Sequence, residues 1–328
     1  MLGKTTHRMI TAVLLVVLSI SGWYGWASSY SIRDYRDTSP GEWKFYYLQS
    51  SEYSSLSVEY DWVSGQDPNA SATALLEERI EITCDKPGGV NTALSGLVPQ
   101  SRTGFTYNLS EIENIEDTCR NIKPDPWSGK MAIYILYLNG WYRGEDDHPM
   151  KKVLGVSYRA SSIAVFRDAV WTGSSGPLSW KREAAVLIHE YGHLMGLVNI
   201  GYRSQLNHEH VTISGTTGNY TREYDKHCND TNCVMYPEIE YLQLNPIIVQ
   251  NQTTNFCVNC TKDISALRTI VDTKVIARYT FLGLAIGSAI CAIIYVVRTV
   301  MKKRPKTDES IQSAELSKDE SMDNQSPP

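Results

Sequence analysis

Three residues in the stretch HEYGHLMGLVN (189–199) are well suited to chemistry: His189, Glu190 and His193. Histidines four positions apart on a helix project from one face, one turn apart, so both imidazoles can reach a single ion. Zinc favours such nitrogen ligands in a roughly tetrahedral site. Glu190 is turned about 100° away from His189, which makes it a poor ligand and suits it to act as a general base on water. The pattern therefore predicts a zinc site in preference to a helix with two chance histidines.

The third ligand is not fixed by this stretch. A catalytic zinc site needs three protein ligands and leaves the fourth position to water. Three residues after Gly196, where a common zinc-peptidase signature has another histidine, this sequence has Asn199, a weak zinc ligand. The histidines further along the chain are His208, His210 and His227. Each of these three is a candidate.

The region after the histidine pair carries a longer pattern. HEYGHLMGL followed by CVMYP resembles the metzincin clan of zinc endopeptidases, and within that clan the archaemetzincins. Their pattern is His-Glu-X-X-His-X-X-Gly-X-X-His-Cys-X4-Cys-X-Met, then Cys-X-X-Cys. Every element occurs here, but 28 residues, Asn199 to Lys226, separate Val198 from His227. The resemblance is specific over roughly residues 179–260.

The resemblance implies a role for each matching residue. His189, His193 and His227 become the zinc ligands, with His208 as the main alternative to His227 and His210 as a lesser one. Glu190 becomes the general base, and Met235 forms the methionine turn beneath the metal. Closing a longer loop adds only about 0.6 kcal/mol per doubling of its length, so the chain can leave and return near the zinc.

Four cysteines have two interpretations. By the resemblance they hold a second, structural zinc, because four thiolates in paired spacings make a closed tetrahedral site. By compartment they would be oxidised to two disulfides. Both interpretations stay open for Cys228, Cys233, Cys257 and Cys260. Cys84 and Cys119 in the N-terminal half are expected to form a disulfide, with two buried free thiols as the alternative.

The elements that must position these residues lie upstream. Residues 179–197 form a helix beginning at Ser179, a plausible N-cap. Before it the hydrophobic pattern predicts strands over 56–63, 89–98, 131–140, 153–160 and 161–168, and helices over 72–83 and 110–120. The order predicts an α+β fold with an α/β-like N-terminal subdomain, a mixed twisted sheet, an active-site helix and a loop-rich C-terminal subdomain. The resemblance implies that this is a metzincin-type zincin fold. It also implies that 161–166 is the edge strand along an extended substrate, an ordinary sheet strand being the alternative.

Two apolar segments lie near the ends of the chain. Residues 9–27 follow basic residues and read as a signal peptide or an uncleaved signal anchor, within a 1–27 leader. Residues 279–297 are 19 positions without a charge, about the length of a membrane-spanning helix. Basic residues follow at once and predict that this end is cytoplasmic. Residues 28–274 are therefore expected outside the cell, and 298–328 as a disordered cytoplasmic tail.

The remaining segments complete the organisation. Residues 28–55 are expected to be a spacer or a pro-segment, and the resemblance implies an extracellular metzincin-like catalytic domain over 56–265. Six glycosylation sequons all lie between 28 and 274, and they open at Asn69, Asn108, Asn219, Asn229, Asn251 and Asn259. The net charge of −5 gives no support for a nucleic-acid partner.

The combined prediction is a membrane-anchored extracellular zinc endopeptidase. It would act on a peptide or protein substrate, with zinc-activated water and Glu190 as the base. The alternative is a zinc-binding surface receptor or adhesin that has lost hydrolysis. Asn199 is the only support for that alternative, and the intact Glu190 argues against it.

Overall fold

The computed structural model describes residues 4–28, 34–99, 106–124, 129–143, 153–171, 179–200, 203–214, 221–237 and 253–303. The chain divides into two compact units. The larger is Ile32–Thr273, and the smaller joins Met1–Ser31 to Lys274–Pro328. The predicted tail beyond residue 303 and the sequons at Asn219 and Asn251 lie outside the described residues.

The larger unit is built on a five-stranded mixed sheet in the order β2-β1-β4-β7-β6. These strands are β1 (Ser55–Trp62), β2 (Val90–Leu97), β4 (Lys130–Leu138), β6 (Gly155–Arg159) and β7 (Ser162–Phe166). The first four in the sheet are mutually parallel, and β6 pairs antiparallel with β7. The central strand β4 is buried after Lys130, which explains its continuous apolar run. The mixed α+β architecture expected from the sequence is confirmed.

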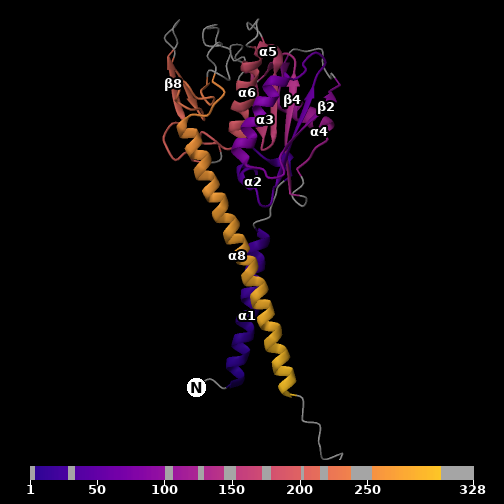
Figure 1. Ribbon diagram of the computed structural model, residues 1–328, viewed down its shortest axis with the longest axis vertical. Helices are drawn as coiled ribbons and strands as arrows, with labels where there is room; N and C mark the ends of the chain where they lie inside the picture. The colour runs from indigo at the N-terminus through magenta and orange to yellow at the C-terminus, as the bar shows by residue number, and fades with distance from the viewer. Residues whose placement is uncertain are drawn as a thin grey trace, which may run out of the picture. The chain divides into compact units, whose positions relative to one another are not determined.

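Helices cover both faces of this sheet. α3 (Ala70–Cys84) connects β1 to β2, and α4 (Leu109–Cys119) connects β2 to β4. Because these two crossovers run in opposite directions along the sheet, right-handed connections place the helices on opposite faces. α6 (Ser179–Leu194) packs against α3 and shares its face (Figure 1). Tyr134 and Tyr137 of β4 are three residues apart and therefore point to opposite faces of the sheet. The Tyr137 hydroxyl donates to Glu183 of α6, and the Tyr134 hydroxyl donates to Asp61.

Shorter elements complete the larger unit. They are η1 (Tyr35–Asp37), α2 (Lys44–Leu48), β3 (Thr106–Tyr107), β5 (Trp141–Tyr142), α5 (Arg167–Trp171), β8 (His210–Ser214) and β9 (Thr221–Asp225). β3 pairs with β5, and β8 pairs with β9 in an antiparallel ribbon. The ribbon lies in the part of the chain that the sequence predicted only as loop.

Two of the sequon asparagines begin helices. The Asn69 side chain accepts hydrogen bonds from the backbone N–H groups of Ser71 and Ala72 at the start of α3. Asn108 and Glu111 form a reciprocal capping box at the start of α4. These caps explain where the two helices start, and glycosylation of the sequons stays a prediction.

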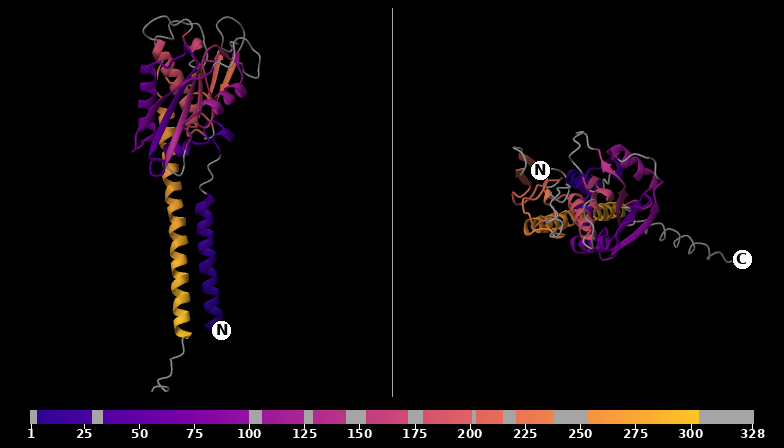
Figure 2. Two further views of the ribbon diagram at one scale, coloured as in Figure 1. Left: turned by 90° about the vertical axis from the view of Figure 1, so that its right-hand side faces the viewer. Right: turned by 90° about the horizontal axis from the view of Figure 1, so that it is seen from above.

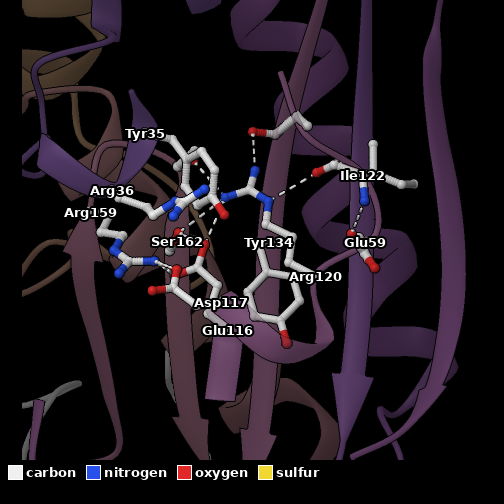
Figure 3. A network of polar contacts seen from close by, with 12 residues as sticks. Tyr35, Arg36, Glu59, Glu116, Asp117, Arg120, Ile122, Tyr134, Arg159 and Ser162 are labelled. Atoms are coloured by element: carbon white, nitrogen blue, oxygen red, sulfur yellow. Dashed lines mark hydrogen bonds and ion pairs between the residues drawn. The ribbon is translucent and has the colours of Figure 1, made fainter. Parts of the chain in front are cut away.

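A buried polar network lies on the α4 face of the sheet (Figure 3). Glu116 receives hydrogen bonds from Arg120 at 2.7 Å, Arg159 at 2.8 Å and the Ser162 hydroxyl at 2.7 Å. The Tyr35 ring lies 4.5 Å from the Arg120 guanidinium. Each buried charge therefore has several partners, as burial of ionised groups requires. The network joins α4, β6, β7 and the N-terminal segment.

The segment interpreted as a spacer or pro-segment is described from Asp34 onward. Its aromatic residues Tyr35, Trp43, Tyr47 and Tyr53 are buried. The Tyr47 hydroxyl donates to the Ala160 carbonyl at 2.8 Å. The segment therefore contributes side chains to the core of the larger unit.

The smaller unit contains α1 (Lys4–Ser28) and the part of α8 (Val258–Lys303) from Lys274 onward. These two helices run side by side (Figures 1 and 2). Among the described residues, Val258–Arg298 is long and apolar enough to cross a membrane, whereas the apolar part of α1, Ile10–Tyr24, is shorter.

Two expectations need correction. Cys84 and Cys119 are both free thiols and form no disulfide. The sheet separates them, because Cys84 ends α3 and touches the Tyr191 hydroxyl of α6, whereas Cys119 ends α4 on the other face. The strand at 161–166 is not an edge strand either. It is β7, which lies between β4 and β6, so the edge beside α6 is β6.

Candidate metal centre

The helix that carries His189 and His193 ends in a glycine-dependent turn. The Gly196 N–H donates to the His193 carbonyl, and the Leu197 N–H donates to the Gly192 carbonyl. This pair of bonds is a Schellman motif, in which the first residue beyond the helix end has a left-handed backbone conformation. Gly196 supplies it with φ of +76°. The chain therefore leaves the helix where the sequence expects it to.

The chain then turns away from the histidine pair. Val198 and Asn199 both have positive φ, 52° and 63°. Asn199 is exposed, and its side-chain oxygen accepts a hydrogen bond from the Ser204 N–H at 2.9 Å. Asn199 is thus part of the turn that opens the excursion.

The excursion returns as a β-ribbon. His210 of β8 pairs with Asp225 of β9 at the base of the ribbon. Just below that base, the Asn229 N–H donates to the His208 carbonyl at 2.8 Å. Backbone pairing therefore closes the 28-residue excursion and delivers His227 two residues after β9 ends.

His189, His193 and His227 come together in the larger unit. One ring nitrogen from each lies within 4.8 Å of the other two, and all three residues are buried. The Nε2 atoms of His189 and His193 are 3.1 Å apart. A tetrahedral zinc site with ordinary Zn–N bonds puts neighbouring nitrogens about 3.4 Å apart, so this spacing suits one ion.

Hydrogen bonds orient two of the rings. His189 Nδ1 lies 2.7 Å from the Val234 carbonyl oxygen, and His227 Nδ1 lies 3.0 Å from the Asp225 carbonyl oxygen. A carbonyl oxygen can only accept, so Nδ1 carries the hydrogen in both rings. The lone pair is then on Nε2, which is how metal-binding histidines are commonly held.

His193 is prepared differently. Its Nδ1 is buried and has no hydrogen-bond partner in the described part of the chain. Burial, with added repulsion from His189 and His227, holds the pKa of His193 well below its usual value. The ring is therefore neutral, which is the form that binds metals. The three donors together fit a divalent ion that prefers nitrogen.

Glu190 lies next to His189 on α6 and is 1% exposed. Its Oε2 accepts a hydrogen bond from the Ser157 N–H at 2.7 Å. Gly155 packs directly against it, since a Cβ at that position would lie 3.0 Å from Glu190 Cγ and 2.7 Å from a Val186 methyl carbon. The edge strand β6 therefore cradles this carboxylate. Sequence reasoning missed Gly155, although a glycine inside a strand is a signal for close approach.

Met235 packs beneath the same helix. A Cβ on Gly192, between the two helix histidines, would fall on the Met235 sulfur and 3.1 Å from the Phe256 ring. Only a glycine leaves room for this contact. Gly192 is a second position that sequence reasoning left without a role.

The four late cysteines form a second cluster. The Sγ atoms of Cys228 and Cys257 are 3.6 Å apart, as are those of Cys233 and Cys260. All four are free thiols with their sulfurs within 4.8 Å of one another, so the two disulfides considered from the sequence are not formed. Four sulfurs around one zinc would stand about 3.8 Å apart. The cluster therefore fits a closed thiolate site.

His208 lies away from the histidine group. Its Nε2 is 2.9 Å from Asp263 Oδ2, and its Nδ1 is 3.4 Å from Cys228 Sγ. The hydrogen bond with Asp263 raises the pKa of His208. His210 contributes backbone to β8, and its side chain lies outside the described residues.

Comparisons with known proteins found little. No protein-family model matches the chain, and no curated protein matches it. The chain is similar to the crystal structure of an archaemetzincin from Methanopyrus kandleri at 18% sequence identity and a TM-score of 0.42. The match covers 65% of this chain and 96% of that one.

Proposed function

We propose that this chain is a zinc-dependent endopeptidase anchored in a membrane, with its larger unit outside the cell. The observation that carries the proposal is the meeting of His189, His193 and His227 beside the buried carboxylate of Glu190. The motif pattern that resembles the metzincins assigns the same three histidines and the same glutamate. A peptide or protein is the substrate class that this chemistry implies.

Each residue has a separate task in the proposed reaction. His189, His193 and His227 would hold the metal, which supplies Lewis-acid chemistry that acidifies water and polarises a carbonyl group. Glu190 takes a proton from the attacking water and gives it to the leaving amine. The Ser157 N–H holds the Glu190 carboxylate in place during this transfer.

The edge strand β6 supports the choice of a peptide substrate. Among the described residues, β6 pairs with β7 along one side only, which makes its other edge a candidate for pairing with an extended chain. Strand addition of this kind recognises backbone more than side chains. The same strand carries Ser157, so a peptide along β6 would lie beside the proposed base.

The alternative of an inactive zinc-binding receptor loses the sequence observation that supported it. It rested on Asn199 as a missing ligand, and Asn199 is an exposed turn residue bonded to Ser204. The third nitrogen near the pair comes from His227 instead.

The test is Glu190→Gln in the purified full chain. We expect hydrolysis of a denatured protein mixture to fall by about 10²- to 10⁴-fold, the usual contribution of a general base. Zinc content should stay the same, because the variant keeps all three histidines. Glu81→Gln, at an exposed site on α3, is the matched control and should cleave at the parent rate. A Glu190→Gln chain that cleaves as fast as the parent would disprove the mechanism.

For the membrane arrangement, we propose that α1 is retained as a second membrane helix. The Ser19 and Ser288 hydroxyl oxygens are 2.7 Å apart. Gly22 packs so closely that a Cβ there would lie 2.8 Å from the Phe281 carbonyl oxygen and 3.0 Å from the Ala285 Cβ. Small residues and hydroxyl bonds of this kind hold membrane helices together. A cleaved signal peptide would have no use for such a fit.

The intact mass of the protein from membranes tests this arrangement. We expect the mass to include residues 4–28, and Ser19→Cys with Ser288→Cys to cross-link on oxidation. Gly283→Cys, where an added Cβ would meet no described residue of another element within 4 Å, should not cross-link to Ser19→Cys and is the control. A mature chain that begins after α1 would refute retention without touching the proposed chemistry.

A further inference from the structure

His208 and Asp263 form a buried pair next to the four-cysteine cluster. Both residues are 1% exposed. Asp263, on α8, accepts from His208 on one carboxylate oxygen and from the Gln205 N–H at 2.8 Å on the other. The second ring nitrogen of His208 faces Cys228 Sγ at 3.4 Å. The pair thus joins the start of the excursion, α8 and the first cysteine.

The partners fix the direction of these hydrogen bonds. An ionised Asp263 can only accept, so His208 Nε2 carries a hydrogen. A cysteine that binds a metal does so as a thiolate, which also only accepts. His208 Nδ1 must then carry a hydrogen and donate it to Cys228 Sγ. Charge-assisted bonds like these are stronger than neutral ones.

The other sulfur contacts make His208 distinctive. Cys233 Sγ accepts from the backbone N–H groups of Met235 at 3.4 Å and Cys257 at 3.3 Å. Cys228 Sγ accepts from the Asp230 N–H at 3.5 Å. In the described part of the chain, the groups outside the four thiols that bond to their sulfurs are backbone N–H groups and one side chain, that of His208. Its contact can therefore be removed by mutation without altering the backbone.

Cys228 also links the two clusters. It directly follows His227, and its N–H donates to the Met235 carbonyl at 2.8 Å. A group that holds the Cys228 sulfur therefore also restrains the stretch that presents His227.

We propose that His208 is a positioning residue of the four-cysteine metal site, held by Asp263 and donating from Nδ1 to Cys228 Sγ. This inference rests on the metal-binding part of the proposed function, and on none of its catalysis. From the sequence, His208 was the main alternative to His227 as a zinc ligand, and the proposal gives it a different role. Mutation of a residue that hydrogen-bonds to a metal ligand typically weakens metal binding about 10- to 100-fold.

The experiment uses the full chain in detergent, loaded with Co²⁺. Thiolate ligands give an intense sulfur-to-cobalt charge-transfer band, and a chelator titration followed at that band gives the affinity of the four-cysteine site. We expect His208→Ala to bind Co²⁺ at this site about 10- to 100-fold more weakly and to shift the band. Asn207→Ala, at the exposed neighbouring position, should match the parent in both respects.

Two further variants keep the test decisive if His208→Ala folds poorly. His208→Gln retains an amide donor and should recover part of the affinity. Asp263→Asn still offers an oxygen to the Gln205 N–H but no longer holds the ring, so it should weaken binding in the same direction as His208→Ala. Parent-like affinity and an unshifted band in folded His208→Ala or Asp263→Asn would overturn the proposal.

The outcomes separate this proposal from the proposed catalysis. A parent chain without a thiolate band would overturn the role of His208, whatever its peptidase activity. A parent chain with the band but no hydrolysis of peptides would overturn the catalysis and leave the role of His208 standing.

Discussion

The histidine cluster and the cysteine cluster meet at two consecutive residues, His227 and Cys228, and are built in different ways. Two members of the histidine cluster are fixed by one turn of α6, and the third arrives after a 28-residue excursion. Two of the four cysteines lie in the turns after β9, and the other two lie just before and just inside the start of α8. His227 and Cys228 are neighbours, so each cluster limits the movement of the other.

The donor chemistry differs in a way that suggests different uses. Three neutral imidazoles leave the charge of a divalent ion uncompensated and one coordination position open, which favours catalysis. Four thiolates close the coordination shell and more than neutralise the ion, which favours a structural role. The buried Glu190 lies next to the histidine cluster, whereas the buried His208 lies beside the cysteines. A carboxylate thus accompanies the three histidines, and an imidazole accompanies the four cysteines.

The largest expected effect is the difference between His227→Ala and His208→Ala in hydrolysis and metal content. His227→Ala should abolish peptide hydrolysis and lose one metal equivalent, because the histidine site falls to two ligands. His208→Ala should keep the metal of the histidine site. Metal content by atomic emission, measured with hydrolysis on the same preparations, checks both. If His208→Ala loses that metal and His227→Ala keeps it, the ligand assignment is wrong.

The next effect concerns the stability contributed by the cysteines. Cys233→Ser should lower the free energy of unfolding by several kcal/mol, since binding of a structural zinc contributes on the order of 10 kcal/mol to folding in small domains. The midpoint of urea unfolding, with and without a chelator, measures it. Cys291→Ser, at an exposed position of α8, is the matched control and should leave the midpoint unchanged. Equal midpoints for both variants would remove the structural role.

Gly155→Ala should separate catalysis from metal binding. The added methyl group would press on Glu190 and Val186 of α6. Misplacing a reacting group by about 1 Å can cost as much as 10²-fold in rate, so hydrolysis should fall by about 10- to 100-fold. The zinc content should remain that of the parent. Loss of zinc in Gly155→Ala would show instead that β6 supports the ligands and not the base.

The smallest expected effect lies in the packing that both clusters share. Gly192→Ala should destabilise the fold by about 1–3 kcal/mol, because its Cβ overlaps the Met235 sulfur. Gly192→Ala combined with Met235→Ala should be destabilised by less than the sum of the two single changes. Urea unfolding of the four chains measures the coupling. Strict additivity would mean that Met235 yields without cost and does not support α6.

Much of the framework was predictable from local pattern. The alternation in β1, the apolar run of β4 and the periodicity of α3 and α6 each reflect how one element meets the core. The prediction failed where a neighbour decides. β7 looks like an edge strand in sequence, but the antiparallel β6 covers it. Cys84 and Cys119 look like a pair, but the sheet stands between their helices.

The sequence by itself determined that His189 and His193 share one helix face with Glu190 beside them, because helix geometry depends only on spacing. It also determined that four cysteines stand in paired spacings. Only the tertiary structure decided which histidine joins the pair, because backbone pairing in the β8–β9 ribbon closes a long excursion and no local rule specifies where its ends meet. The same pairing places His208 at the cysteines, where Asp263 from α8 meets it.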